Sequence, residues 1–73
     1  MHRSETPLER RVGMAIEQSP YLAGRNLRVE TAAGLVILKG IVGSYYQKQM
    51  AQEAARRIDG VRSIENRLEV MYT

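Results

Sequence analysis

Few residues in this chain have side chains that commonly take part in catalysis. There is a single histidine, His2, and no cysteine, which excludes thiol catalysis, disulfides and thiolate metal sites together. Asp59 is expected at the end of a helix and the glutamates on exposed faces, so no catalytic triad, metal cluster or buried carboxylate pair can be assembled. We therefore predict that the protein is not an enzyme and holds no cofactor or metal.

Cationic side chains are the more promising chemical groups. The formal net charge is +3, from nine arginines and two lysines against eight carboxylates. Guanidinium groups bind phosphates and carboxylates well, so affinity for anionic surfaces is one interpretation. The arginines are scattered along the chain and several have acidic neighbours. A solvated surface of ion pairs is therefore the competing interpretation.

Capping residues and helical spacing of apolar residues predict two helices. The segment Thr6–Glu9 combines an N-cap threonine, a proline suited to the first helical position and a glutamate at the capping-box position. It predicts a helix over residues 7–18. Ser44 and Gln47 repeat the capping-box pattern, and the apolar residues after them predict a second helix up to Ile58.

Three further segments have the composition of strands: Leu27–Thr31, Leu35–Val42 and Ile64–Val70. The first two are joined by a short turn and should form an antiparallel hairpin. The second helix must cross between the other two, which makes those strands parallel. The predicted fold is α+β, in the order α-β-β-α-β, with a mixed three-stranded sheet and both helices packed on one face. The pattern leaves the central strand open.

The segments around the second helix share a longer pattern. Gly34–Val42 has the form G-x-V-x-L-x-G-x-V, and Gly60–Val70 has the form G-V-x-x-V-x-N-x-L-x-V with Ile64 at the second valine. Between them lies a helix capped by Ser44 with spaced alanines. The pattern resembles the BON domain, a small module of bacterial envelope and osmotic-shock proteins. The match covers about residues 8–70 of a single domain, residues 1–73. The resemblance implies an interaction module that binds phospholipid, other envelope components or a protein partner.

Three glycines are interpreted as structural. Gly34 suits the positive φ of the hairpin turn, Gly40 lets a neighbouring segment approach the sheet, and Gly60 caps the second helix. The segment Gly40–Gly43 also spells the G-x-x-G of KH domains, whose glycines allow close approach to a nucleic-acid backbone. That loop joins two helices in KH domains, whereas Ile41 continues a strand here. A small basic KH-like nucleic-acid-binding domain is therefore the alternative function, with nucleic acid the less favoured partner.

The second strand has two faces, and the helices can cover only one. Val36, Leu38 and Val42 are expected to face the helices. The opposite face then carries apolar and basic side chains: Leu35, Ile37, Ile41, Arg28 and Arg67. This face predicts contact with a second copy, as a homodimer, or with another protein. A purely structural oligomerisation domain is a further alternative, and a monomer whose long charged side chains fold over the strip is the competing interpretation.

The second helix offers another candidate surface, a lipid-facing rim of Tyr45, Tyr46, Lys48 and Arg56. Tyrosine beside cations suits a layer of lipid headgroups. Because the rim has no deep apolar face, it predicts weak peripheral binding at most, and an ordinary solvated helix surface is the competing interpretation.

The beginning of the chain bears on where the protein is found. Residues 1–20 include charged side chains and lack the apolar core of a signal peptide, and no segment has the roughly 20 apolar residues of a membrane span. The chain as it stands is expected in the cytoplasm. If it is a fragment of an exported protein, it is expected in the periplasm or at the envelope.

Overall fold

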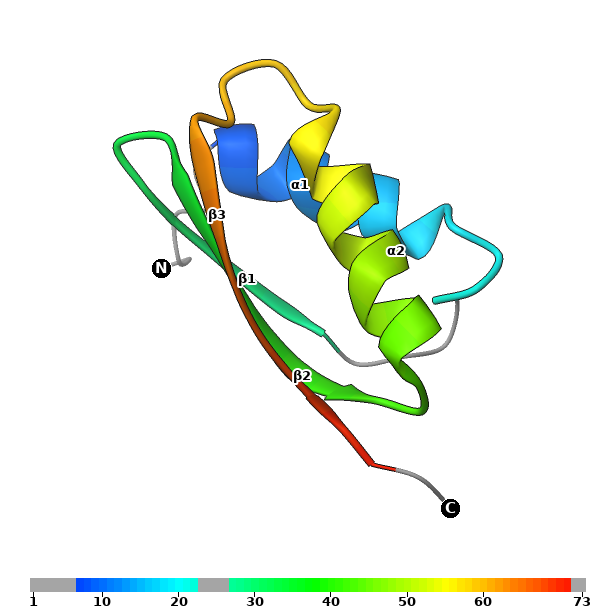
Figure 1. Ribbon diagram of the computed structural model, residues 1–73. Coiled ribbons are helices and arrows are strands. Elements are labelled where there is room, and N and C mark those ends of the chain that lie inside the picture. The colour runs from blue at the N-terminus through cyan, green and yellow to red at the C-terminus, as the bar shows by residue number, and fades with distance from the viewer. Residues whose placement is uncertain (1–6, 23–26, 72–73) are drawn as a thin grey trace, which may run out of the picture.

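The computed structural model describes residues 7–22 and 27–71. In chain order these form helix α1 (Pro7–Glu17), strands β1 (Arg28–Ala32) and β2 (Leu35–Val42), helix α2 (Tyr45–Arg56) and strand β3 (Ser63–Val70). The central strand is β2, which pairs antiparallel with β1 and parallel with β3. Both helices lie on the same side of the sheet (Figure 1). The predicted α+β fold and element order are therefore confirmed.

The bounds of the helices differ slightly from those that the sequence indicates. Helix α1 ends at Glu17 rather than at residue 18, and α2 ends at Arg56 with Arg57 as its C-cap. Gly60 is therefore not the C-cap of α2. It has φ 100° and lies in the following turn, in which the amide of Val61 donates to the carbonyl of Ile58 at 3.2 Å. The N-cap predicted at Thr6 lies outside the described residues.

The hairpin turn has the positive φ that was predicted. Ala33 and Gly34 have φ values of 52° and 88°, as a two-residue turn between antiparallel strands requires. A Cβ atom on Gly34 would lie 2.6 Å from Cδ of Arg62, so this position excludes a side chain for a second reason. Gly40, inside β2, has φ 136°. Glycine adopts this positive φ more readily than other residues, and the strand pattern of the sequence does not reveal that position 40 needs it.

The core lies between the sheet and the two helices. Val36, Leu38 and Val42 point from β2 into it and are fully buried, whereas Ile41 on the other face is 51% exposed. The predicted inner face of β2 is therefore confirmed. The core also contains residues from α1, α2, β3 and the segment after α1: Val12, Ile16, Ala51, Ala55, Leu68 and Leu22. The alanines of α2 let that helix lie close to the strands.

Candidate interaction surfaces

One candidate surface is built where α2 begins. Ser44 is the N-cap of α2, and its hydroxyl accepts from the amide of Gln47 at 3.1 Å. The side chain of Gln47 accepts from the amide of Gly43 at 2.6 Å and donates to the carbonyl of Tyr21 at 3.0 Å. Gln47 thus ties the segment after α1 to the first turn of α2. The buried Leu22 anchors the same segment in the core.

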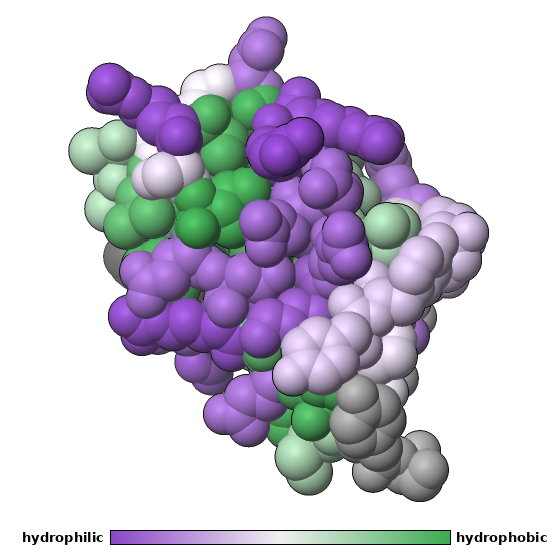
Figure 2. Space-filling model, in the orientation of Figure 1, coloured by the Kyte–Doolittle hydropathy of each residue, from purple (hydrophilic) through white to green (hydrophobic). Residues whose placement is uncertain are grey.

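These contacts gather three tyrosines and one lysine, which we call the tyrosine cluster: Tyr21, Tyr45, Tyr46 and Lys48. The rings of Tyr21 and Tyr46 meet edge to face, with centroids 5.1 Å apart. The ammonium of Lys48 lies 6.0 Å from the centroid of the Tyr45 ring. All three rings are at least half exposed, with exposed fractions of 51% for Tyr21, 66% for Tyr45 and 52% for Tyr46. Figure 2 shows pale, near-neutral side chains over this end of the molecule, beside strongly hydrophilic ones.

The tyrosine cluster differs from the predicted lipid-facing rim at two positions. Arg56 lies at the other end of α2, about 16 Å along the helix from Tyr45, and forms an ion pair with Glu53 at 3.7 Å. Tyr21 belongs to the cluster as well, and the sequence did not predict it. Hydrogen bonding with Tyr21, and then charge repulsion from it, raises the pKa of Tyr46.

The second candidate surface is the side of the sheet away from the helices, which we call the open sheet face. The strand register places Arg28, Lys39 and Arg67 side by side across the three strands, and Ile37 in the next row. All five residues predicted for an interaction surface lie on this face: Leu35, Ile37, Ile41, Arg28 and Arg67. Figure 1 shows that neither helix covers it.

The charges of the open sheet face are balanced. Lys39 and Glu30 form an ion pair at 3.3 Å across β1 and β2, and Arg67 pairs with Glu65 along β3. With Arg28 and Glu69 the face carries three cations and three carboxylates. Because these charges cancel, the face suits a surface of mixed charge better than an anionic one.

Side chains accept hydrogen bonds from backbone amides on both outer strands of the sheet. The carboxylate of Glu9, from α1, accepts from the amide of Thr31 on β1 at 3.3 Å. On β3, the side chain of Asn66 accepts from the amide of Leu68 at 3.2 Å. Amides that are already bonded cannot pair with an added strand. At these positions the sheet is therefore protected from edge-to-edge pairing, while its open face stays accessible.

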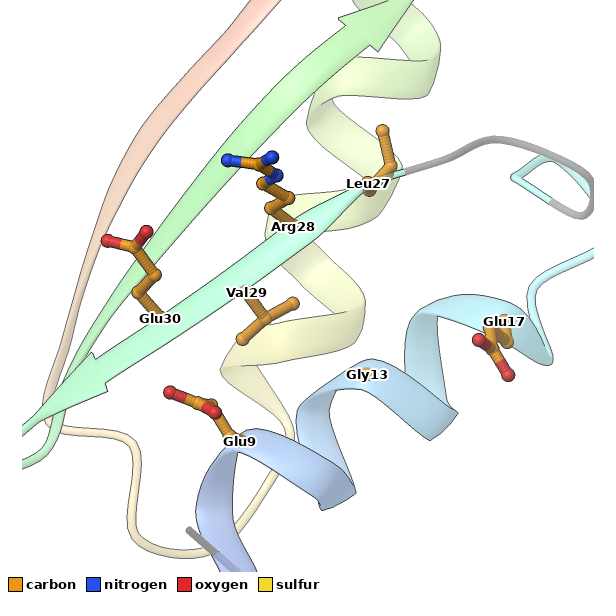
Figure 3. A pocket seen from close by; sticks show the side chains of 7 residues that line it. All are labelled: Glu9, Gly13, Glu17, Leu27, Arg28, Val29 and Glu30. Atoms are coloured by element: carbon orange, nitrogen blue, oxygen red, sulfur yellow. The ribbon is translucent and has the colours of Figure 1, made fainter. Parts of the chain in front are cut away.

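A polar groove of about 480 Å³ separates α1 from β1. Figure 3 shows Glu9 and Val29 pointing into it, whereas Arg28 and Glu30 point toward the other side of the sheet. Gly13 lies in the middle of α1, and a Cβ atom there would meet no other atom within 4 Å. The groove thus has space for a side chain at position 13.

Gly13→Ala is expected to raise the free energy of unfolding by about 0.5–1 kcal/mol, because glycine inside a helix is less favourable than alanine by about that amount. Urea unfolding followed by circular dichroism measures the change. Gly34→Ala is the matched control, since its Cβ atom would collide with Arg62, and it should destabilise the protein. A loss of stability in Gly13→Ala would show that the groove has no space for a methyl group at position 13.

The G-x-x-G segment lies in a different setting from the loop of a KH domain. Gly40–Val42 belongs to β2, and Gly43 and Ser44 lead directly into α2. The G-x-x-G segment therefore joins a strand to a helix, unlike the loop between two helices in KH domains.

In residues 7–22 and 27–71, no three His, Cys, Asp or Glu side chains are grouped to hold a metal ion. Neither of the helices described there is long and apolar enough to cross a membrane.

Comparison with known proteins gives two findings. The sequence model of the BON domain matches residues 4–72. A 45-residue segment is 42% identical to Osmotically-inducible protein Y of Escherichia coli (strain K12), which covers 62% of this chain and 22% of that protein. The chain thus matches less than a quarter of the length of this relative. Because the family pattern extends over nearly all of its residues, this chain belongs to the BON domain family.

Proposed function

We propose that this chain is a non-enzymatic interaction module that binds anionic phospholipid surfaces weakly through the tyrosine cluster. The observation that carries this proposal is a group of exposed tyrosines where α2 begins: Tyr21 and Tyr46 are in ring contact, and the neighbouring Tyr45 lies 6.0 Å from the ammonium of Lys48. Membership of the BON domain family supports a binding role. The name of the similar protein, Osmotically-inducible protein Y, supports a role in osmotic stress, and a location at the cell envelope is part of the proposal.

The chemistry of the cluster suits the headgroup layer. A tyrosine ring is apolar along its body and polar at its hydroxyl, so it is stable where acyl chains meet water. A lysine near an anionic membrane surface contributes about 1 kcal/mol, and this attraction falls off within about one Debye length, roughly 10 Å in 0.1 M salt. With one lysine in the cluster, binding should be weak, reversible and sensitive to salt.

Flotation with vesicles tests the proposal. The protein should float with vesicles that contain anionic phospholipid at low ionic strength, and not with neutral vesicles or at high ionic strength. Tyr45→Ser combined with Tyr46→Ser, and separately Lys48→Glu, should abolish flotation. Arg56→Glu is the matched control, because Arg56 lies on the same helix at the far end, and it should float like the natural sequence. An equal loss in Arg56→Glu, or no flotation of the natural sequence with anionic vesicles, would refute the proposal.

A protein partner on the open sheet face is the second candidate. It is favoured by the half-exposed Ile41 at the end of a strip that also contains Leu35 and Ile37. Uncovered apolar positions bordered by charges are typical of contact surfaces between proteins. This surface lies on the other side of the sheet from the helix that carries most of the tyrosine cluster, so the two functions can be separated by mutation.

A further inference from the structure

The open sheet face has an ordered arrangement of charge. Its side chains form rows across the strands, about 6.7 Å apart, because every second residue of a strand points to the same face. One of the two middle rows, which we call the carboxylate row, consists of Glu30, Ile37 and Glu65. The other, which we call the cation row, consists of Arg28, Lys39 and Arg67. Leu35 lies one row beyond the carboxylate row, and Ile41 lies one row beyond the cation row.

The charges on this face are complementary to the charges on the same face of a second copy. Consider a two-fold axis in the plane of the face, parallel to the rows and midway between the two middle rows. It places Glu30 over Arg28 of the second copy and Glu65 over Arg67 of the second copy. It also places Leu35 over Ile41 of the second copy. We propose that the open sheet face binds a second copy of this chain about this axis, in a dimer whose facing strands run antiparallel.

Three other two-fold arrangements of the same faces bring like charges together. An axis parallel to the strands would place Arg28 over Arg67 and Glu30 over Glu65. An axis along the carboxylate row would place Glu30 over Glu30, and one along the cation row would place Arg28 over Arg28. Like charges in a desolvated contact cost several kcal/mol. Among these arrangements, only the midway axis pairs opposite charges at both outer strands.

The shape of the face agrees with the midway axis. A hollow of about 400 Å³ lies at one end of it, lined by Lys39, Gly40, Ile41, Arg67 and Glu69. The midway axis brings Leu35 and Ile37 of the second copy to this hollow. The face therefore offers space where apolar side chains arrive. Glu9 and Asn66 accept hydrogen bonds from one amide on each outer strand, which hinders edge-to-edge pairing at these positions and leaves the open sheet face accessible.

The area of the face sets the strength of the dimer. Three strands of up to eight residues span about 14 Å by about 26 Å, which corresponds to less than about 1,200 Å² buried in total and to a weak complex. We expect a Kd between about 10 μM and about 1 mM. Sedimentation of the purified chain should show a rise in mean mass from monomer toward dimer over that range.

Paired charge reversals test the register. Arg28→Glu places a carboxylate over Glu30 of the second copy, and Glu30→Arg places a guanidinium over Arg28 of the second copy. Each change acts twice in the dimer, so each should raise the Kd at least about tenfold. An equimolar mixture of the two variants should associate, because every contact at these positions again joins opposite charges. The double variant Arg28→Glu/Glu30→Arg should also associate.

Arg10→Glu is the control, because Arg10 is exposed on α1 and its reversal changes the net charge by the same amount. It should leave the Kd unchanged. A chain that is monomeric up to about 1 mM, or a mixture that stays monomeric like its components, would overturn the proposal. The same would follow from equal effects of Arg10→Glu and Arg28→Glu.

Failure of this dimer and failure of lipid binding are distinguishable. The midway axis reverses the strand direction, so the tyrosine clusters of the two copies lie at opposite ends of the dimer and do not bind one flat membrane together. Arg28→Glu should therefore float with anionic vesicles like the natural sequence, whether or not it dimerises.

Discussion

Leu38→Ala should lower the free energy of unfolding by about 3 kcal/mol, near the lower end of the range for buried leucine. Leu38 is fully buried on the central strand, between strands β1 and β3 and beneath the helices. Removing its side chain leaves a cavity that the strands on either side cannot easily fill. A domain of this size has a stability near the low end of about 5–15 kcal/mol. The variant should therefore lose a large part of its stability.

Urea unfolding followed by circular dichroism measures this loss, and Ile41→Ala is the matched control. Ile41 lies three residues further along the same strand, on the open sheet face, and is 51% exposed. Its truncation should cost less than about 1 kcal/mol, because little apolar surface is removed from contact with the protein. If the two variants lost similar stability, the inward and outward faces of β2 would have been assigned wrongly.

The faces of β2 could be predicted because strand periodicity is strict. Side chains alternate between two faces, so an error of one residue would have buried Ile37 and exposed Leu38. The central position of β2 could not be predicted in the same way, since it depends on which strands pair with β2. Both a hairpin and a crossover connection begin or end at β2, and only the structure shows that β1 and β3 lie on opposite sides of it.

The candidate surfaces were predictable to different degrees. The residues of the open sheet face follow from periodicity, but the order of its charges depends on the register between three strands, which the sequence pattern does not specify. The tyrosine cluster depends on a contact between Tyr21 and Tyr46. These residues are brought together by the hydrogen bond from Gln47 to the carbonyl of Tyr21, across 26 positions of the chain. Local spacing carries no signal for such a contact.

The roles of the glycines could also be predicted only in part. The positive φ of Gly34 follows from its place in a tight turn, and the structure confirms it. Gly60 follows an apparent helix end, and the sequence pattern for a C-cap and for a turn after the helix is the same. The structure shows that α2 ends at Arg56, with Arg57 as its C-cap. Ends of helices are decided by a few local hydrogen bonds, so they are the least predictable part of such a fold.

Asn66→Asp should lower the free energy of unfolding by about 2–3 kcal/mol, the second largest effect that we expect. The amide of Asn66 donates to the carbonyl of Lys48 at 3.0 Å and to the side-chain oxygen of Gln52 at 3.1 Å, so it joins β3 to α2. A carboxylate at this position would face two oxygens that it cannot donate to. Asn66→Ala, which adds no charge, should cost less, about 1–2 kcal/mol.

The pH dependence of the Asn66→Asp variant separates lost hydrogen bonds from added charge. The two facing oxygens favour the protonated acid, so they raise the pKa of the new carboxyl in the folded state above its value in the unfolded chain. The penalty is then full above the folded-state pKa and decreases as the pH falls through it, because the protonated acid can donate to Lys48. Urea unfolding at several pH values should therefore show the stability of Asn66→Asp approaching that of the natural sequence under acid, while the deficit of Asn66→Ala stays constant. A deficit in Asn66→Asp that does not change with pH would mean that its carboxyl turns to solvent and that α2 and β3 are held together without it.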